Sequence, residues 1–181
     1  MKIDPYKHKE KYFKWKEKVR NGLPNLCKKN SDVILQYISD MENGLNVSSK
    51  SVKGPRSYIR LNNLQQRLVS LAKQIKEYSG VALTDITEEQ LFRFFSAMRN
   101  GEVSRKDGGT YQSVVDYVKP FKAFWHWHMK VNKKKGVMVR DITEDLDASK
   151  PKPRWVYLTE EDVRKLCDHA RPQYRVLMMF I

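Results

Sequence analysis

One long apolar stripe constrains the fold of this chain more than any other feature of its sequence. After Gly54-Pro55 and before Gly80, apolar side chains recur at steps of three and four residues: Leu61, Leu64, Leu68, Leu71, Ile75 and Tyr78. That spacing places them on one face of a helix of about six turns. No stretch of useful length alternates polar and apolar residues as a strand does. The sequence therefore predicts an all-α fold.

Two shorter helices are expected on either side of this stripe. The first is capped by Asn30 or Ser31 and ends at Gly44, because glycine readily adopts the left-handed conformation of a helix end. The second begins at Thr87 and Gln90, which have the spacing of a capping box. Its expected buried face comprises Leu91, Phe94, Phe95 and Met98.

A fourth helix is expected to open at Thr110. Pro120 lies inside it and lacks a backbone N–H, so we expect a kink or a local break there. Four helices joined by short loops predict a small bundle over residues 28–140. The expected core face of the fourth helix comprises Val114, Val118, Phe121, Trp125 and Met129.

The first 27 residues form a basic extension that is expected to be helical. Tyr12, Trp15 and Val19 fall at positions i, i+3 and i+7, which predicts an amphipathic helix within residues 5–20. Three roles are open for this helix: docking on the bundle, contact with flanking DNA, and contact with a neighbouring protomer.

The composition changes after Gly136. Residues 141–147 are acidic, and Lys150-Pro151-Lys152-Pro153 is typical of an extended linker, so we expect a linker over residues 141–154. Residues 158–163 then repeat a capping pattern and begin another helix. The apolar run at residues 174–181 has no C-terminal cap. We therefore expect residues 155–181 to be the beginning of a second, truncated domain.

The charge of the chain is unevenly distributed. The formal net charge is +14, from 35 Lys and Arg against 21 Asp and Glu, and nearly all of the excess lies in residues 1–30 and 101–140. Basic blocks interleaved with Tyr and Trp favour nucleic acid as a partner, with a solvated basic face as the alternative. The two distant cysteines and the lack of a long apolar segment predict a soluble, DNA-associated cytoplasmic protein with no membrane partner. The cysteines and histidines lack the spacing of zinc ligands, so no metal is expected, and neither is a cofactor or a small-molecule substrate.

The fourth helix and the segment after the linker share their order with a known family. Thr110 is followed eight and nine positions later by Val118 and Lys119, and then by Phe121; Leu158-Thr159-Glu160-Glu161-Asp162-Val163 follows the basic linker. Across roughly residues 28–181 this ordered set resembles the tyrosine recombinases, and within them the phage, viral and archaeal integrases.

The resemblance implies a four-helix, SAM-like core-binding domain followed by the first helices of a catalytic domain. The family clamps double-stranded DNA at recombination sites, with four protomers on paired sites. Its catalytic Arg residues stabilise the charge on the phosphate, and its Tyr forms a 3′-phosphotyrosine. Those residues are expected beyond Ile181, so we assign no catalytic residue and expect this chain to be inactive alone.

The resemblance also implies which side chains meet DNA, because the second and fourth helices of the family's bundle face the major groove. Arg and Lys would neutralise phosphates, whereas Asn63 and Gln112 could read adenine. His126 and Trp127 could stack on a sugar or base. The full set of expected contacts is Lys53, Arg56, Ser57, Arg60, Asn63, Arg105, Lys106, Thr110, Tyr111, Gln112, Lys119, Lys122, His126, Lys130, Lys133 and Lys134.

A second interpretation remains open. A non-catalytic, basic, helical DNA-binding regulator or accessory protein, complete in itself, would show the same charge pattern. A downstream reading frame that encodes an Arg, a His-x-x-Arg pair and a Tyr would distinguish the recombinase from this alternative.

Overall fold

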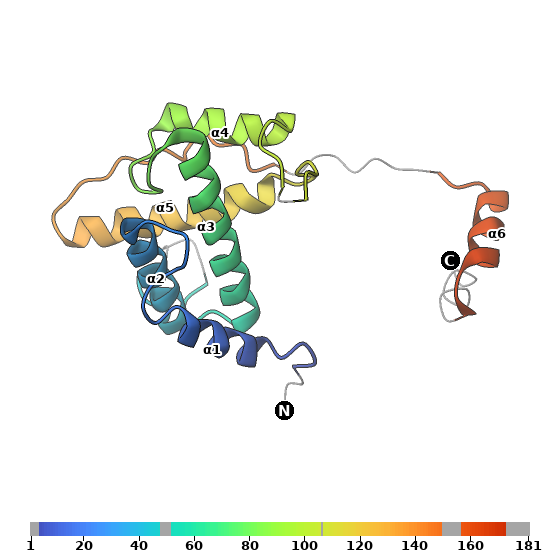
Figure 1. The fold of residues 1–181 in the computed structure, drawn as a ribbon, viewed down its shortest axis with the longest axis horizontal. Coiled ribbons are helices and arrows are strands. Elements are labelled where there is room, and N and C mark those ends of the chain that lie inside the picture. Colours follow the sequence, from blue (N-terminus) through green and yellow to red (C-terminus); the bar gives the residue numbers. More distant parts are fainter. Residues whose placement is uncertain (1–3, 48–51, 106, 150–156, 173–181) are drawn as a thin grey trace. The chain divides into compact units, whose positions relative to one another are not determined.

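A computed structural model describes residues 4–47, 52–105, 107–149 and 157–172, and this part of the chain is helical and contains no strand (Figure 1). The chain divides into an N-terminal unit, Met1–Lys150, and a C-terminal unit, Pro151–Ile181. No described helix is both long and apolar enough to cross a membrane. The helices are α1 His8–Lys18, α2 Lys28–Asn43, α3 Tyr58–Ser79, α4 Glu88–Asn100, α5 Val115–Lys134 and α6 Glu160–His169.

The central helix of the N-terminal unit is α3. Figure 1 shows it running between the other helices, and α1, α2, α4 and α5 each contact it. The predicted stripe is confirmed from Leu61 to Ile75, whose side chains are buried, while Tyr78 is 45% exposed beside Phe94. Gly80 ends the helix with a φ of 73°, a conformation that glycine adopts without a Cβ penalty.

The start of α2 differs from the prediction. The helix begins at Lys28, so Asn30 and Ser31 lie inside its first turn and cap nothing of their own. Both side chains are buried, and they accept hydrogen bonds from other segments: Asn30 Oδ1 from Leu83 N and Ser31 Oγ from Leu23 N, each at 2.8 Å. Asn30 and Ser31, which were predicted to cap the helix, thus hold two loops on the bundle. The predicted end at Gly44 is confirmed.

The start of α4 is as predicted. Thr87 Oγ1 accepts from Gln90 N at 3.2 Å, and Gln90 Oε1 accepts from Thr87 N at 3.1 Å, which completes the capping box. The expected face of Leu91, Phe94, Phe95 and Met98 is fully buried.

The start and the middle of α5 differ from the prediction. The helix begins at Val115, so Thr110 lies in the preceding loop. It continues through Pro120 to Lys134 without the expected break. Proline removes only one backbone hydrogen bond. The burial of Pro120 and of its neighbour Phe121 offsets the free energy lost with that bond. The predicted core face is confirmed for Val118, Phe121, Trp125 and the N-cap Val114, which are buried, and Met129 is partly buried against the core.

The N-terminal helix α1 docks on the bundle. Tyr12 and Val19 of the predicted stripe are buried, and the Tyr12 ring centroid lies 5.6 Å from that of Tyr58. Asn62 Nδ2 on α3 donates to the carbonyl of His8 at 2.9 Å. Of the three roles considered for this helix, docking is the one that the structure shows.

In the C-terminal unit, α6 begins at the predicted capping pattern. Thr159 Oγ1 accepts from Asp162 N at 3.2 Å, and Asp162 Oδ2 accepts from Thr159 N at 3.0 Å. Residues 150–156 and 173–181, which contain the Lys-Pro linker motif and the apolar run, lie outside the described residues.

The role of Ser31 gives a prediction about stability. Ser31→Ala removes the acceptor of the buried Leu23 N–H, so we expect the free energy of unfolding to fall by about 1–3 kcal/mol. Urea denaturation followed by circular dichroism measures the change. Ser39→Ala, on the exposed side of the same helix, is the matched control; an equal loss there would contradict the assigned bond.

Candidate nucleic-acid interface

A basic furrow runs between the first half of α3 and α5. It consists of two adjoining hollows of about 220 and 270 Å³ that share Arg60 and Leu64. We call this the α3/α5 furrow. The polar and charged side chains that line it are Asn46, Arg56, Arg60, Asn63, Arg67, Asp116 and His126, with Tyr37 and Trp127.

Three guanidinium groups line the furrow against one carboxylate. Among the described residues, Asp116 is the only acidic one that lines the furrow, and its Oδ2 lies 4.0 Å from Arg67 Nη2. The side chain of Arg60 is exposed and makes no hydrogen bond or ion pair within the described part of the chain. The Arg56 guanidinium donates to the carbonyl of Val52 at 2.7 Å and makes no ion pair with the described residues. The furrow therefore presents unneutralised positive charge to solvent.

The phenol of Tyr37 lies near this charge. Burial raises the pKa of Tyr37 to about 12, and the positive charges of Arg60 and Arg56 act in the opposite direction. Both guanidinium groups therefore contribute positive potential at the Tyr37 wall of the furrow.

Lys119 extends the basic surface along α5. It lies three residues after Asp116 and four before Ala123, both of which line the furrow, so it shares their helix face. Lys119 is exposed and makes no side-chain hydrogen bond or ion pair with the described residues.

The prediction that Trp127 stacks on a nucleic acid is wrong. Its side chain is 2% exposed and packs edge-on against Tyr37, with centroids 5.1 Å apart. Trp127 Nε1 donates to Asp40 Oδ2 at 2.7 Å, and Asn46 Nδ2 donates to the same oxygen at 2.8 Å. Trp127 therefore supports the furrow from beneath.

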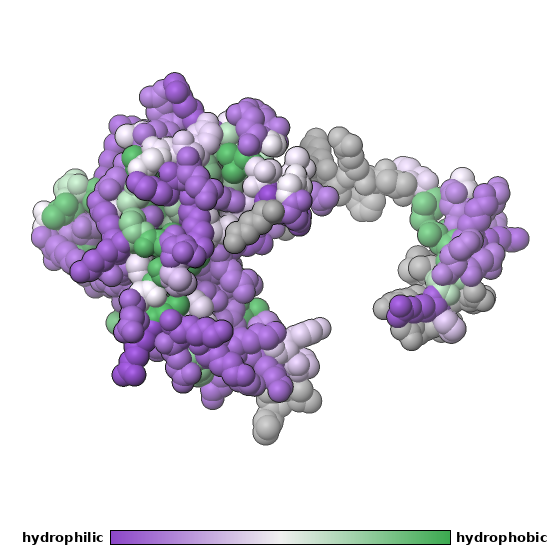
Figure 2. All heavy atoms as spheres, viewed as in Figure 1, coloured by the Kyte–Doolittle hydropathy of each residue, from purple (hydrophilic) through white to green (hydrophobic). Residues whose placement is uncertain are grey.

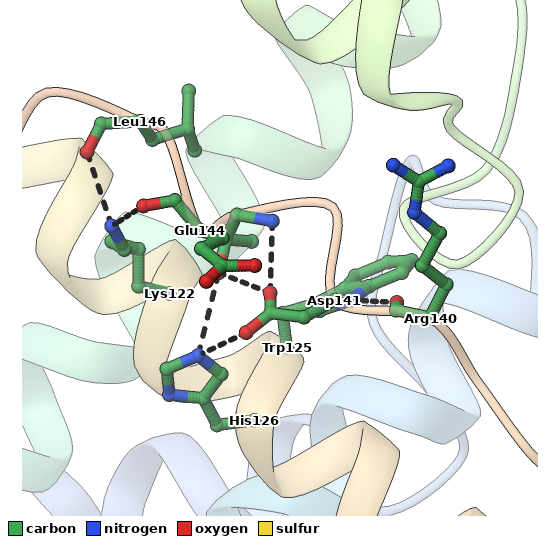
Figure 3. A network of polar contacts seen from close by, with 8 residues as sticks. Lys122, Trp125, His126, Arg140, Asp141, Glu144 and Leu146 are labelled. Atoms are coloured by element: carbon green, nitrogen blue, oxygen red, sulfur yellow. Dashed lines mark hydrogen bonds and ion pairs between the residues drawn. The ribbon is translucent and has the colours of Figure 1, made fainter.

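Residues 140–148 pack against α5, although all of them after Arg140 were expected to belong to a linker. We call them the strap. Ile142, Thr143 and Leu146 are buried, and Trp125 Nε1 donates to the carbonyl of Arg140 at 3.0 Å. Lys122 Nζ donates to the carbonyls of Glu144 and Leu146, at 3.2 and 3.0 Å (Figure 3). The Lys122 ammonium group is thus hydrogen-bonded within the protein.

His126 is also held by the strap. Its Nε2 lies 2.9 Å from Asp141 Oδ2, and Thr143 donates to Asp141 Oδ1 through its backbone N and its hydroxyl, at 2.9 and 2.7 Å (Figure 3). Burial alone would raise the pKa of Asp141, but the Thr143 hydrogen bonds and His126 outweigh burial and hold it below its ordinary value. The carboxylate is therefore ionised at neutral pH.

The remaining predicted contacts are not gathered in the furrow. Thr110 and Gln112 are exposed in the loop before α5, and Tyr111 and Arg105 line a different hollow, beside α1. Lys106 lies outside the described residues. Lys53 is exposed in the loop before Ser57, which is the N-cap of α3.

The basic residues at the end of α5 behave differently from one another. Lys130 Nζ donates to the carbonyl of Val47 at 2.8 Å, and Lys134 Nζ donates to Asn46 Oδ1 at 2.6 Å, so both fasten the loop after α2. Lys133 is exposed.

One furrow residue, Arg67, was absent from the predicted set. Its guanidinium carbon lies 4.3 Å from the centroid of the Tyr117 ring, a cation–π contact. Arg60, Asn63 and Arg67 step by three and four residues along α3, so the spacing that places two of them on one face also includes the third.

Among the described residues, no group of three His, Cys, Asp or Glu side chains is arranged to hold a metal ion. Comparisons with protein-family models, with curated proteins and with solved structures find no match for this chain. The furrow is therefore interpreted from its own chemistry.

The lowered pKa of Asp141 gives a second prediction. Asp141→Asn should reduce the free energy of unfolding at pH 7 by about 1 kcal/mol, because the charge-assisted bonds to Thr143 and His126 are weakened. A carboxyl whose pKa is lower in the folded state stabilises the fold above its ordinary pKa of 3.8. The difference between the proteins should therefore shrink as the pH falls through the folded-state pKa.

Urea denaturation at a series of pH values measures this difference. Asp145→Asn is the control, because Asp145 is an exposed neighbour that makes no hydrogen bond or ion pair with the described residues. A pH-independent effect of Asp141→Asn would contradict the assigned role of the carboxylate.

Proposed function

We propose that this chain is the DNA-binding portion of a site-specific tyrosine recombinase of the integrase type, and that the α3/α5 furrow is its surface for double-stranded DNA. The DNA-binding part of this proposal rests on one observation, the set of cations on this furrow. Arg56, Arg60 and Arg67 line the furrow, and Lys119 lies beside it on the same face of α5, against the carboxylate of Asp116.

The furrow cations are better placed to bind phosphate than the other basic residues of the predicted set. Lys122, Lys130 and Lys134 already donate to carbonyl or amide oxygens, so their binding to phosphate would break internal hydrogen bonds. The side chains of Arg60 and Lys119 make no hydrogen bond with the described residues, so they can bind phosphate without breaking one. Each phosphate that they neutralise releases a condensed counterion, which favours binding at low salt.

The furrow also offers a means of base recognition. Asn63 is exposed on the α3 face that carries Arg60 and Arg67, and its amide has both a donor and an acceptor. An Asn side chain can pair with the N6 and N7 groups of adenine in the major groove. Arginines on either side would fix the register of α3 on the phosphates.

The assignment to tyrosine recombinases adds partners and chemistry to this proposal. It rests on the Thr110, Val118, Lys119 and Phe121 pattern and on the capped segment that begins α6. Other protomers of the same recombinase would assemble on paired sites, and a catalytic domain would supply the Tyr nucleophile. No residue of this chain is given a catalytic role.

The first experiment measures binding of a labelled DNA duplex by fluorescence anisotropy between about 50 and 200 mM salt. The double variant Arg60→Ala, Lys119→Ala should bind all sequences on the order of tenfold or more weakly. The slope of log affinity against log salt should become shallower by roughly two, one for each lost phosphate contact.

The matched control removes the same two kinds of charge elsewhere. Lys28→Ala with Arg93→Ala takes one exposed Lys from the start of α2 and one exposed Arg from α4, neither of which lines the furrow. This control should retain nearly full affinity. Equal losses in both double variants would show that binding follows total charge, and the furrow assignment would fail.

A second experiment separates a recombinase from a DNA-binding regulator. A coding sequence that continues after residue 181 with an Arg, a His-x-x-Arg pair and a Tyr should yield a longer protein that forms a covalent adduct with a nicked substrate. A stop codon after Ile181 would support the non-catalytic regulator.

A further inference from the structure

A second hollow lies on another face of α3, outside the furrow. It measures about 730 Å³, a size typical of ligand sites, and it is bounded by α1, the turn that follows α1, α3 and the loop before α5. We call it the α1/α3 hollow. Figure 2 shows one face of the protein, on which hydrophilic side chains predominate and apolar ones form small patches between them.

Three aromatic side chains line the α1/α3 hollow. Trp15, Tyr111 and Tyr117 are each half-buried, so part of each ring remains accessible. Tyr111 and Tyr117 meet edge to face with centroids 5.0 Å apart. These rings come from α1, the loop and α5. Because the Tyr111 and Tyr117 rings are nearly perpendicular, at 81°, a flat aromatic ligand can stack on the face of one of them but not of both.

Three cations accompany the rings. Lys18, Lys73 and Arg105 line the hollow, with Glu77 as its single acidic residue. Arg105 is paired with Asp107, whereas Lys18 and Lys73 make no side-chain hydrogen bond or ion pair with the described residues. The charge of the hollow therefore suits an anion.

Amide groups supply the third component. Gln65, Gln66 and Gln74 line the hollow, and each amide can both donate and accept. Gln74 Nε2 donates to the Tyr111 hydroxyl, and Gln74 Oε1 is a buried oxygen to which no described residue donates a hydrogen bond. A buried acceptor left unpaired is costly, and the N–H groups of a base bound beside Tyr111 would supply the missing donor.

We propose that the α1/α3 hollow binds an unpaired nucleotide of single-stranded nucleic acid. The base stacks on the face of one of these rings, the amides meet its edge, and Lys18 and Lys73 face the flanking phosphates. An apolar ligand would leave these cations without counter-charge, and an acidic peptide would not use the flat rings. This site is separate from the furrow, and the proposal does not depend on duplex binding there.

The test uses a fluorescently labelled oligo-dT strand, with binding followed by anisotropy. Tyr111→Leu keeps an apolar side chain but removes the stacking face, so affinity should fall on the order of tenfold. Lys73→Gln keeps the length of the side chain but removes one phosphate contact, so the salt dependence should become shallower by roughly one unit. Circular dichroism of each variant confirms that the fold is retained.

Two controls separate this site from the furrow and from general charge. Lys28→Gln removes an exposed cation at the start of α2 and should leave oligo-dT affinity unchanged. The double variant Arg60→Ala, Lys119→Ala should weaken duplex binding and leave oligo-dT binding intact. Loss of both activities in that double variant would assign the single strand to the furrow and overturn the proposal.

A competition experiment distinguishes a nucleotide from a peptide. Unlabelled oligo-dT should displace the labelled strand at far lower concentration than a poly-Glu peptide of equal charge. Equal displacement, or unchanged oligo-dT affinity in both Tyr111→Leu and Lys73→Gln, would overturn the proposal.

Discussion

The burial of one face of α3 holds the N-terminal unit together. Its stripe from Leu61 to Ile75 is almost fully removed from water, and each large apolar side chain of that kind contributes about 1.5–3 kcal/mol. Four other helices contact α3, so its position fixes theirs. The same helix carries Arg60 and Arg67 on one exposed face and Lys73 and Gln74 on another. Both proposed binding surfaces therefore depend on the packing of a single helix.

Internal hydrogen bonds decide which cations remain available for a ligand. Lys122 and Lys130 donate hydrogen bonds to carbonyl groups of the strap and of Val47, and His126 is hydrogen-bonded to Asp141. These contacts fasten non-helical segments to α5, where backbone acceptors would otherwise be left without partners. Arg60 and Lys119 take no part in such contacts among the described residues. A high net charge alone does not distinguish these two groups of basic residues.

The two proposed surfaces share one contact. The Arg67 guanidinium belongs to the furrow, and the Tyr117 ring over which it lies belongs to the α1/α3 hollow. Asp116, next to Tyr117 in the chain, pairs with the same guanidinium. Arg67 is thereby held in the furrow by α5, although neither its role nor this contact was part of the sequence prediction.

The sequence by itself determined the all-α class, the stripe of α3, the capping boxes of α4 and α6, and the glycines that end α2 and α3, because these signals act within one or two helical turns. The tertiary structure decided the rest. Asn30 and Ser31 accept hydrogen bonds from the backbone of Leu83 and Leu23, and Pro120 lies buried within a continuous helix. Trp127 donates to Asp40, and the strap forms hydrogen bonds with Lys122 and His126. Each of these outcomes depends on a partner that comes near only when the helices pack, and no local pattern specifies that partner.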